Sequence, residues 1–232
     1  MEQLIAKIKH YLSFAGLIVL PAKKQNIIDE FHKLYYDSYL IGGTWTSNKF
    51  LGVATQKCPL DLFVYQEILY ETKPDLIIEA GTANGGGALY LASICDLMGH
   101  GEVLTIDITD LGNLPVHKRI SYLFGSSTSE EIIKKVEERI QGKNRVMVIL
   151  DSDHSKNHVL QELRLYHRYV TSGCYLIVED TNVNSHPVRP EHGPGPAEAL
   201  SEFFDENSDF IVDREREKAY LTFNPGGYLR KK

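Results

Sequence analysis

Carboxylates follow four apolar runs of the sequence, each at the point where a buried strand would end. These residues are Glu79, Asp107, Asp151 and the adjacent pair Glu179 and Asp180. In a parallel sheet of right-handed strand–helix–strand units, the carboxyl ends of the strands share one edge, so these side chains should meet across one crevice. Like charges brought together require either a proton on one member or a cation between them. Asp151, Glu179 and Asp180 therefore indicate a site for Mg²⁺, ahead of Mn²⁺ or Ca²⁺, because all their ligand atoms are oxygens.

A glycine-rich turn follows the first of these runs. Four glycines lie within residues 81–87, between an apolar run that ends near Glu79 and a segment with helical character. Such a turn lets a ligand approach the backbone and directs helix N–H groups at it. The spacing is not that of the dinucleotide fingerprint, and similar turns also join strands to helices in proteins that bind nothing. Asp107 favours a nucleotide-like ligand, because a carboxylate at the end of the second strand can hold a ribose by its hydroxyls.

Two histidines follow the third carboxylate. His154 lies three residues after Asp151 and could remove a proton from a substrate hydroxyl, since a histidine pKa near ~6.5 suits this task. The other interpretation is that His154 only caps or packs against its helix. His158, one turn later, could form a zinc pair with it, but no third soft ligand is evident. We therefore expect His158 behind the ligands or at the surface.

Strands and helices alternate along most of the chain and would position these residues. Apolar runs predict strands at 76–79, 103–106, 119–124, 146–150 and 175–178, with helices between them. Helices are also predicted over residues 23–40 and 59–72, the second with proline in its first turn. Two final strands, 210–212 and 219–223, would pair antiparallel. The pattern predicts an α/β domain at 59–232, preceded by a helical arm and lid segment at 1–58.

Composition narrows the class of protein. A chain of 232 residues with 43% hydrophobic residues can bury a full core, and its net charge of −6 offers no basic surface for nucleic acid. Three cysteines without C-x-x-C spacing indicate reduced thiols and a cytoplasmic protein. The apolar stretch 11–20 is too short to span a bilayer and lacks a cleavage site. It predicts a packing arm of a homo-oligomer, with peripheral membrane contact through Leu4, Ile5, Ile8 and Leu12 as the less favoured alternative.

Several ordered motifs carry a resemblance to a known family. They are Asp151-Ser-Asp-His154, the segment YLIVEDTN at 175–182, GPGP at 193–196 and NPGGY at 224–228. From about Trp45 to Arg230 the chain resembles the cephalosporin hydroxylase family, which despite its name has the fold of S-adenosylmethionine-dependent methyltransferases. That family is similar to the magnesium-dependent catechol O-methyltransferases. The resemblance implies a Rossmann-like class I methyltransferase, with a seven-stranded, mostly parallel sheet in the order 3-2-1-4-5-7-6 and helices on both faces.

The resemblance also implies a role for each candidate residue. It places five residues around the methionine part of S-adenosylmethionine: Glu79, Gly81, Thr82, Gly85 and Gly86. It places Asp107 on the ribose hydroxyls. It places Gly125, Ser126 and Ser127 by the adenine. Glu79 suits a cofactor that carries an ammonium and a sulfonium, whereas it would repel a pyrophosphate. Asp151, Glu179 and Asp180 match the metal triad of the catechol enzymes, which usually have Asn at the last position. His154 stands where those enzymes carry a lysine base.

The implied reaction is metal-assisted O-methylation of a hydroxyl on a small molecule, natural product or sugar. The metal would lower the pKa of the acceptor hydroxyl and align the resulting oxygen with the sulfonium methyl. The loops at 42–57 and 183–196 would select the acceptor. One alternative is a glycosyltransferase that uses Asp151-Ser-Asp153 as a D-x-D motif. Another is a hydroxylase, whose iron ligands could come only from His154, His158 and Asp151.

Overall fold

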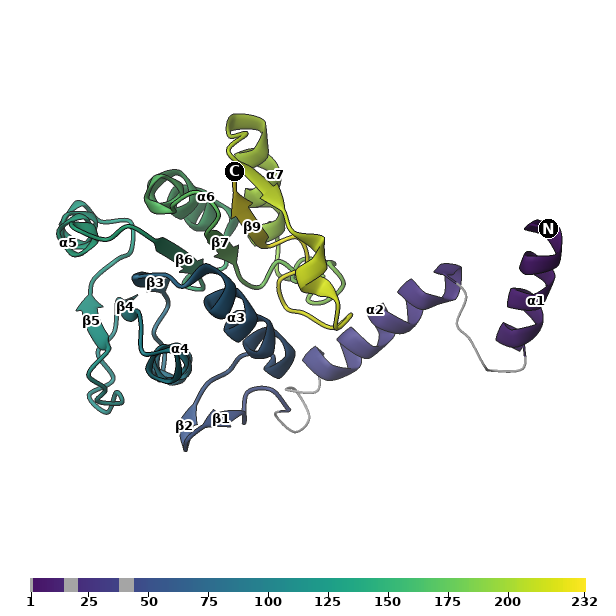
Figure 1. Ribbon diagram of the computed structural model, residues 1–232, viewed down its shortest axis with the longest axis horizontal. Helices are drawn as coiled ribbons and strands as arrows, with labels where there is room; N and C mark the ends of the chain where they lie inside the picture. Colours follow the sequence, from purple (N-terminus) through teal and green to yellow (C-terminus); the bar gives the residue numbers. More distant parts are fainter. Residues whose placement is uncertain (1, 15–20, 38–43) are drawn as a thin grey trace.

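The computed structural model describes residues 2–14, 21–37 and 44–232, which form an α/β body preceded by two helices (Figure 1). The elements before the main sheet are α1 (Glu2–Phe14), α2 (Pro21–Asp37), β1 (Lys49–Phe50), β2 (Val53–Ala54) and α3 (Pro59–Thr72). The body continues with β3 (Leu76–Ala80), α4 (Gly86–Met98), β4 (Glu102–Asp107), β5 (Ile120–Phe124), α5 (Glu130–Ile140), β6 (Val146–Leu150), α6 (Lys156–Tyr166) and β7 (Tyr175–Val178). It ends with α7 (Pro196–Glu206), β8 (Phe210–Val212), the short helix η3 (Arg214–Glu217) and β9 (Tyr228–Lys231).

The seven-stranded sheet has the order β5-β4-β3-β6-β7-β9-β8. Its first five strands are parallel, and β9 lies antiparallel between β7 and β8. When the seven strands of this sheet are numbered in chain order from β3, their order in the sheet is 3-2-1-4-5-7-6. The predicted fold is therefore confirmed. The central strands β3 and β6 are buried along their whole length, as expected for strands covered on both faces.

Helices cover both faces of the sheet (Figure 1). One hydrophobic core lies under α3 and α4 and includes Tyr65, Ile68 and Leu91. The other lies under α5, α6 and α7 and includes Val136, Leu163 and Phe203. Since the parallel strands are held between these two layers, their carboxyl ends converge on one edge of the molecule.

The prediction of a strand at residues 219–223 was wrong. The antiparallel partner of β8 is Tyr228–Lys231, after the turn at Gly226. Leu221 and Phe223 are buried, but they pack against Tyr36 of α2 rather than within the sheet. Their alternating apolar pattern therefore reflects docking of α2, not strand formation.

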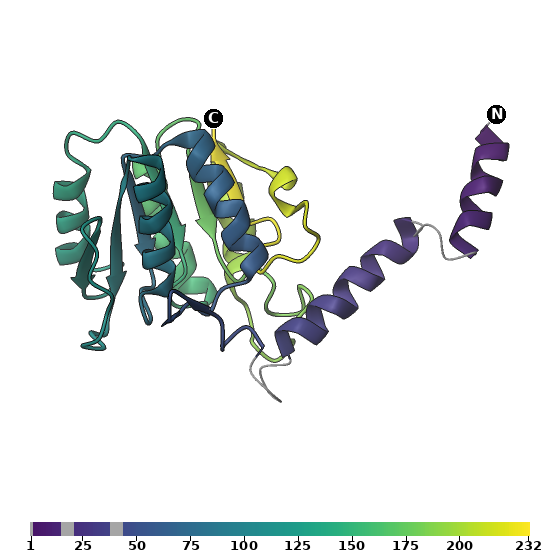
Figure 2. The ribbon, with the colours of Figure 1, turned by 60° about the horizontal axis from the view of Figure 1, so that its bottom comes forward.

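The N-terminal helices extend away from the body (Figure 2). The end of α2 is attached, because the His32 ring stacks on Phe223 and its Nε2 lies 2.9 Å from the Asn182 amide nitrogen. By contrast, α1 exposes Leu4 and Ile5. The predicted helix at 23–40 corresponds to α2 as far as Asp37, and residues 38–40 lie outside the described part. None of the helices described has both the length and the apolar character required to cross a bilayer.

Candidate functional site

The glycine turn after β3 passes directly against the end of β6. Gly81 has a φ of 105°, and a Cβ atom there would lie 1.8 Å from the carbonyl oxygen of Asp151, so only glycine fits. The Asp107 carboxylate accepts hydrogen bonds from the backbone N–H groups of Thr82 (3.0 Å), Ala83 (2.9 Å) and Thr109 (3.0 Å). Asp107 thereby fixes the turn to the end of β4. Gly85 caps α4, and Gly86 is the first residue of that helix.

A cavity of about 610 Å³ opens on this turn. Its lining includes Gly81, Asp107, Gly125, Ser126 and Ser127, from the ends of β3, β4 and β5. Five of the predicted cofactor residues are thus brought to one space of the size typical of a ligand site. Its polar groups include the carboxylates of Asp107 and Asp153, the serine hydroxyls and the ring of His158.

Glu79 lies beneath the turn and is almost fully buried, at 1% exposure. Its Oε2 accepts a hydrogen bond from the Thr105 hydroxyl at 2.7 Å, whereas Oε1 has no hydrogen-bond partner within the described part of the chain. Burial raises the pKa of Glu79 to about 7. A buried carboxylate with an unsatisfied oxygen is costly unless a ligand supplies a donor.

Asp151, His154 and Asp180 form an acidic cluster at the ends of β6 and β7. One potential metal-ligand atom of each lies within 4.8 Å of the others. His154 Nε2 lies 3.4 Å from Asp151 Oδ1 and 3.2 Å from Asp180 Oδ2, yet neither contact has hydrogen-bond geometry. This leaves Nε2 buried without a hydrogen-bond partner among the described residues. Carboxylate oxygens of Asp151 and Asp180 within 4.8 Å of one another suit a bound divalent cation.

The proximity of these charges changes their pKa values. Burial lowers the pKa of His154, but the carboxylates of Asp180 and Asp151 outweigh it and raise the pKa to about 9. Burial raises the pKa of Asp180, and it raises that of Glu179 to about 8 with help from the nearby Asp151 carboxylate. Before any ligand binds, His154 is therefore protonated at neutral pH.

Glu179 points to a different partner, Lys57, which the sequence analysis missed. The Lys57 ammonium lies 2.6 Å from Glu179 Oε1 and 2.5 Å from Asp151 Oδ2. Its side chain is only 5% exposed. Lys57 lies in the loop before α3, where neither helical nor strand periodicity applies; its only sequence signal is a lone lysine next to the Cys58-Pro59 start of a buried helix.

A second polar cluster surrounds the buried Glu162 and includes residues that line the larger cavity. Glu162 is fully buried, and its Oε1 accepts hydrogen bonds from the hydroxyls of Ser127 (2.5 Å) and Ser152 (2.7 Å). His158 Nε2 lies 3.4 Å from the same oxygen. His158 lines the cavity itself and is not part of the group formed by Asp151, His154 and Asp180.

Asp153 also lies apart from the acidic cluster. Its carboxylate accepts a hydrogen bond from the Ser155 N–H at 2.7 Å and caps the start of α6. A D-x-D motif requires both carboxylates to face one ion. This arrangement does not favour the glycosyltransferase alternative.

A smaller cavity of about 340 Å³ adjoins the first. It shares Gly81, Ala83, Asp151 and Ser152 with the larger cavity. Its other walls include Tyr36 and Trp45, Lys57 and Glu79, His154 and Asp180, and Arg189 from the loop after β7. An acceptor held here would lie between the acidic cluster and the glycine turn.

The strand order, with its last strand inserted antiparallel, and the site at the carboxyl edge define a class I S-adenosylmethionine-dependent methyltransferase. Residues 43–232 match the family model described as rhamnosyl O-methyltransferase/CmcI. The chain belongs to this family, and the expected family, fold and enzyme class, an S-adenosylmethionine-dependent O-methyltransferase, are confirmed.

Named relatives agree with this assignment. The chain is 38% identical to the rhamnosyl O-methyltransferase of Mycobacterium tuberculosis (strain H37Rv) over 98% of this chain and 94% of that protein. It is 37% identical to the Mycobacterium leprae enzyme of the same name, over 94% and 95%. A solved structure described as "cmcI-D160 Mg-SAM" has a TM-score of 0.62 and 20% identity, with 84% of each chain covered. A second, "CmcI-N160 apo-structure", also has a TM-score of 0.62, at 22% identity, covering 80% of this chain and 76% of that one.

Proposed function

We propose that the enzyme transfers a methyl group from S-adenosylmethionine to a hydroxyl of a rhamnosyl or similar deoxysugar unit, with Mg²⁺ as cofactor. The observation that carries this proposal is the pair of adjoining cavities, which share a wall at Gly81 and Asp151. One cavity has the carboxylate expected for a ribose, and the other has the acidic cluster. The mycobacterial relatives are named for a rhamnosyl acceptor, which supports the choice of sugar.

In this proposal the cofactor occupies the larger cavity and extends its methionine part into the smaller one, which Glu79, Thr82 and Gly86 line. Gly81, Thr82, Gly85 and Gly86 surround its methionine part, and Asp107 accepts hydrogen bonds from its ribose hydroxyls. Gly125, Ser126 and Ser127 lie by its adenine. The unsatisfied oxygen of Glu79 faces the charge of a cationic cofactor, which suits the burial of this carboxylate.

The acidic cluster fits a divalent cation. Asp151 and Asp180 offer oxygens near the unsatisfied His154 Nε2, and Glu179 is adjacent in sequence. We propose Asp151, Glu179 and Asp180 as the metal ligands. A bound Mg²⁺ would lower the pKa of the acceptor hydroxyl. Hard oxygen ligands favour Mg²⁺ over softer metals, and Mn²⁺ or Ca²⁺ would also fit.

His154 is proposed as the group that takes the proton. With a pKa of about 9 it cannot do so while its charge compensates Asp151 and Asp180. It becomes a proton acceptor only when another cation compensates the charge of these two carboxylates, so that His154 can lose its own proton. The loop segments 44–57 and 183–196 supply Trp45 and Arg189 to the acceptor cavity and exclude water from it. In this scheme residues 1–58 form the arm and lid, and residues 59–232 form the transferase domain.

Isothermal titration calorimetry with S-adenosylmethionine, a sugar nucleotide and 2-oxoglutarate tests the class of reaction. We expect binding heat with S-adenosylmethionine and none with the sugar nucleotide or 2-oxoglutarate. Binding of either other compound, without binding of S-adenosylmethionine, would overturn the proposal in favour of the glycosyltransferase or the hydroxylase. Release of S-adenosylhomocysteine with a rhamnoside, compared with a glucoside, then tests the acceptor.

Two substitutions separate the cofactor residues from the metal residues. Asp107→Ala should weaken S-adenosylmethionine binding and leave Mg²⁺ binding intact. Glu179→Ala should do the reverse. Equal loss of both ligands in each variant would contradict the separate sites.

We also propose a cytoplasmic homo-oligomer of this enzyme. Exposed apolar side chains on α1 (Leu4, Ile5 and Ile8) and on α2 (Phe31 and Leu34) provide an unpaired surface. Cys58, Cys95 and Cys174 are free and buried, which suits a reducing compartment. Light scattering of the full chain and of an Ile5→Glu, Ile8→Glu variant tests the assembly; a monomer in both cases would rule it out.

A further inference from the structure

Lys57 lies between two of the acidic residues of the site and contacts both. Its Nζ lies 2.5 Å from Asp151 Oδ2 and 2.6 Å from Glu179 Oε1, with the side chain 5% exposed. Glu79 is near enough to interact electrostatically with the same ammonium. A lysine this deeply buried is rare unless it is paired, and here the pairing is with two carboxylates at once.

The contacts divide the oxygens of Asp151 between two partners. Oδ2 faces Lys57, while Oδ1 faces His154 and the metal-ligand cluster at 3.4 Å. Lys57 therefore sets the rotation of the carboxylate. It also holds Glu179 by a single oxygen. Among the described residues, the ion pairs of Lys57 are with Asp151 and Glu179, whereas His154 contacts Asp180; the lysine approaches the acidic residues from the side of α4.

The surrounding backbone makes room for this side chain. A Cβ atom on Gly87 of α4 would lie 2.7 Å from Lys57 Cε and 2.8 Å from Glu79 Oε1. The carbonyl oxygen of Lys57 accepts a hydrogen bond from the Asn48 side chain at 3.0 Å. Both features hold the lysine in one path, past the start of α4 and into the site.

The charge balance explains why a cation is needed there. Glu79, Asp151, Glu179 and Asp180 place four carboxylates around this edge. Asp180 adds a further carboxylate within 4.8 Å of Asp151 and His154. Uncompensated charges of one sign in a buried site oppose one another strongly.

We propose that Lys57 is a positioning residue of the metal site: a resident ammonium that holds Asp151 and Glu179 together and offsets part of the negative charge of this edge. This inference rests on the proposed metal-dependent function. Lys57 assembles the acidic site before a divalent cation arrives. It also opposes that cation electrostatically, because both positive charges interact with Asp151.

Removal of the ammonium should therefore have two measurable effects. The metal-free protein should melt earlier, since two buried carboxylates lose their partner. A divalent cation should then bind more tightly and restore the lost stability, since it becomes the main source of positive charge. Because the ammonium and a divalent cation would repel each other at close range, loss of the ammonium should raise the affinity for the cation by at least about tenfold.

The test uses the full chain with Lys57→Met, Lys57→Arg and a matched control, Lys49→Met. Lys49 is exposed on β1 in the same loop region, so its replacement removes the same charge without touching the site. Mn²⁺ binding is followed by the electron paramagnetic resonance signal of the free ion. Melting temperatures are recorded with and without Mn²⁺, and S-adenosylmethionine binding is measured by calorimetry.

We expect Lys57→Met to bind Mn²⁺ at least about tenfold more tightly than the wild type and to gain more in melting temperature from Mn²⁺. Lys49→Met should match the wild type in both measurements, and Lys57→Arg should retain most of the wild-type Mn²⁺ affinity because it keeps the charge. Unchanged or weaker Mn²⁺ binding in Lys57→Met would overturn the inference, even if the variant is less stable.

If Lys57→Met folds only with Mn²⁺, the inference is supported in its extreme form. If it does not fold at all, Lys57→Arg decides: Mn²⁺ affinity that departs from the wild type by tenfold or more would overturn the role of the charge, and wild-type affinity would support it. Failure of the wild type to bind Mn²⁺ and S-adenosylmethionine would instead overturn the proposed function itself.

Discussion

Two carboxylate clusters lie near the start of α3, and they differ in the groups that form hydrogen bonds or ion pairs with their carboxylates. Asp61, in the first turn of α3, contacts only neutral groups: its Oδ1 accepts a hydrogen bond from the Tyr228 hydroxyl at 2.9 Å, and its Oδ2 accepts one from the Phe223 N–H at 2.8 Å. Asp151 and Glu179, by contrast, contact the ammonium of Lys57. Only three residues separate Lys57 of one cluster from Asp61 of the other.

The difference separates a structural cluster from a binding site. Both oxygens of Asp61 have partners, so its cluster is complete without a ligand and joins α3 to the segment before β9. At the acidic edge, Glu79 Oε1 and His154 Nε2 are buried without hydrogen-bond partners among the described residues. Groups left unsatisfied in this way destabilise the protein alone and gain from a bound cation or cofactor.

The largest effect expected from this comparison is the loss of catalysis in Asp151→Asn. The amide removes the charge of a proposed metal ligand, so methyl transfer to the proposed rhamnoside acceptor should fall by roughly 10²–10³-fold or more. The free energy of unfolding should change by less than about 2 kcal/mol, because Lys57 keeps its contact with Glu179. Initial rates and urea denaturation measure the two quantities; a variant that unfolds readily but still catalyses at the wild-type rate would erase the distinction between the clusters.

Asp61→Ala should have the opposite profile. It leaves the Tyr228 hydroxyl and the Phe223 N–H buried without an acceptor, which costs about 3–5 kcal/mol of stability. For a chain of this size, that corresponds to a fall of roughly 10 °C in melting temperature. Mn²⁺ affinity of the folded variant should stay within about threefold of the wild type. Asp61→Asn is the matched control, since it retains one acceptor oxygen and should lose less stability.

Much of the fold could be predicted because buried parallel strands are short, continuous apolar runs. The runs at 76–79, 146–150 and 175–178 became β3, β6 and β7, and the order of the sheet followed from the resemblance. The last strand was misplaced because segment 219–223 is as apolar as a strand. Its side chains are buried against α2, a tertiary contact that strand periodicity cannot distinguish from a sheet.

The candidate site could be predicted where chemistry coincides with strand ends. Asp151 and Asp180 were expected at one edge, and the structure brings them together beside His154. Lys57 was missed because its partners lie 94 and 122 residues away in the sequence and its own loop has no periodicity. Glu162 was missed for another reason. In the sequence of a helix such as α6, a buried glutamate cannot be distinguished from a glutamate on the solvent-facing side.

His32 extends the comparison to a buried group that can change its charge with pH. Burial lowers its pKa to about 4, so in the docked helix α2 it is neutral at pH 7. Because the docked state binds fewer protons than an undocked state with a pKa near 6.5, docking is fully stable above about pH 6.5 and weakens as the pH falls toward 4. Between pH 7 and pH 5 the loss should be roughly 2 kcal/mol.

Hydrogen exchange of the α2 amides measures this loss of docking. Protection should fall between pH 7 and pH 5 after correction for the intrinsic exchange rate, whereas the central strands β3 and β6 should keep theirs. His32→Gln can still form a hydrogen bond with Asn182 but does not titrate, so its α2 should show the same protection at both pH values. The same pH dependence in this variant would assign the effect to another group.

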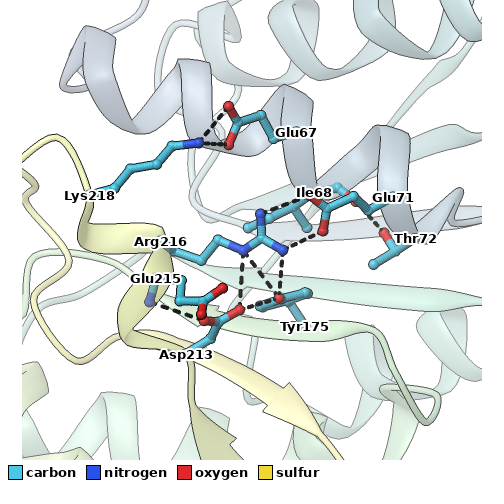
Figure 3. Close-up of polar contacts among 9 residues, drawn as sticks. All are labelled: Glu67, Ile68, Glu71, Thr72, Tyr175, Asp213, Glu215, Arg216 and Lys218. Carbon is cyan, nitrogen blue, oxygen red and sulfur yellow. Dashed lines mark hydrogen bonds and ion pairs between the residues drawn. The ribbon is translucent and has the colours of Figure 1, made fainter.

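The smallest effect concerns ion pairs at the surface, where water hydrates and screens the charges, as it cannot in the buried clusters. On the outer side of α3, η3 and the following residue contact α3 through Arg216 with Glu71 and through Lys218 with Glu67, the latter pair at 2.5 Å (Figure 3). The Lys218 side chain is 56% exposed, so water already screens and hydrates it. Glu67→Gln should therefore change stability by no more than about 0.5–1 kcal/mol, or a melting temperature by about 1–3 °C. A loss as large as that of Asp61→Ala would mean that the number of contacts, rather than burial without water, determines what a carboxylate contributes in this fold.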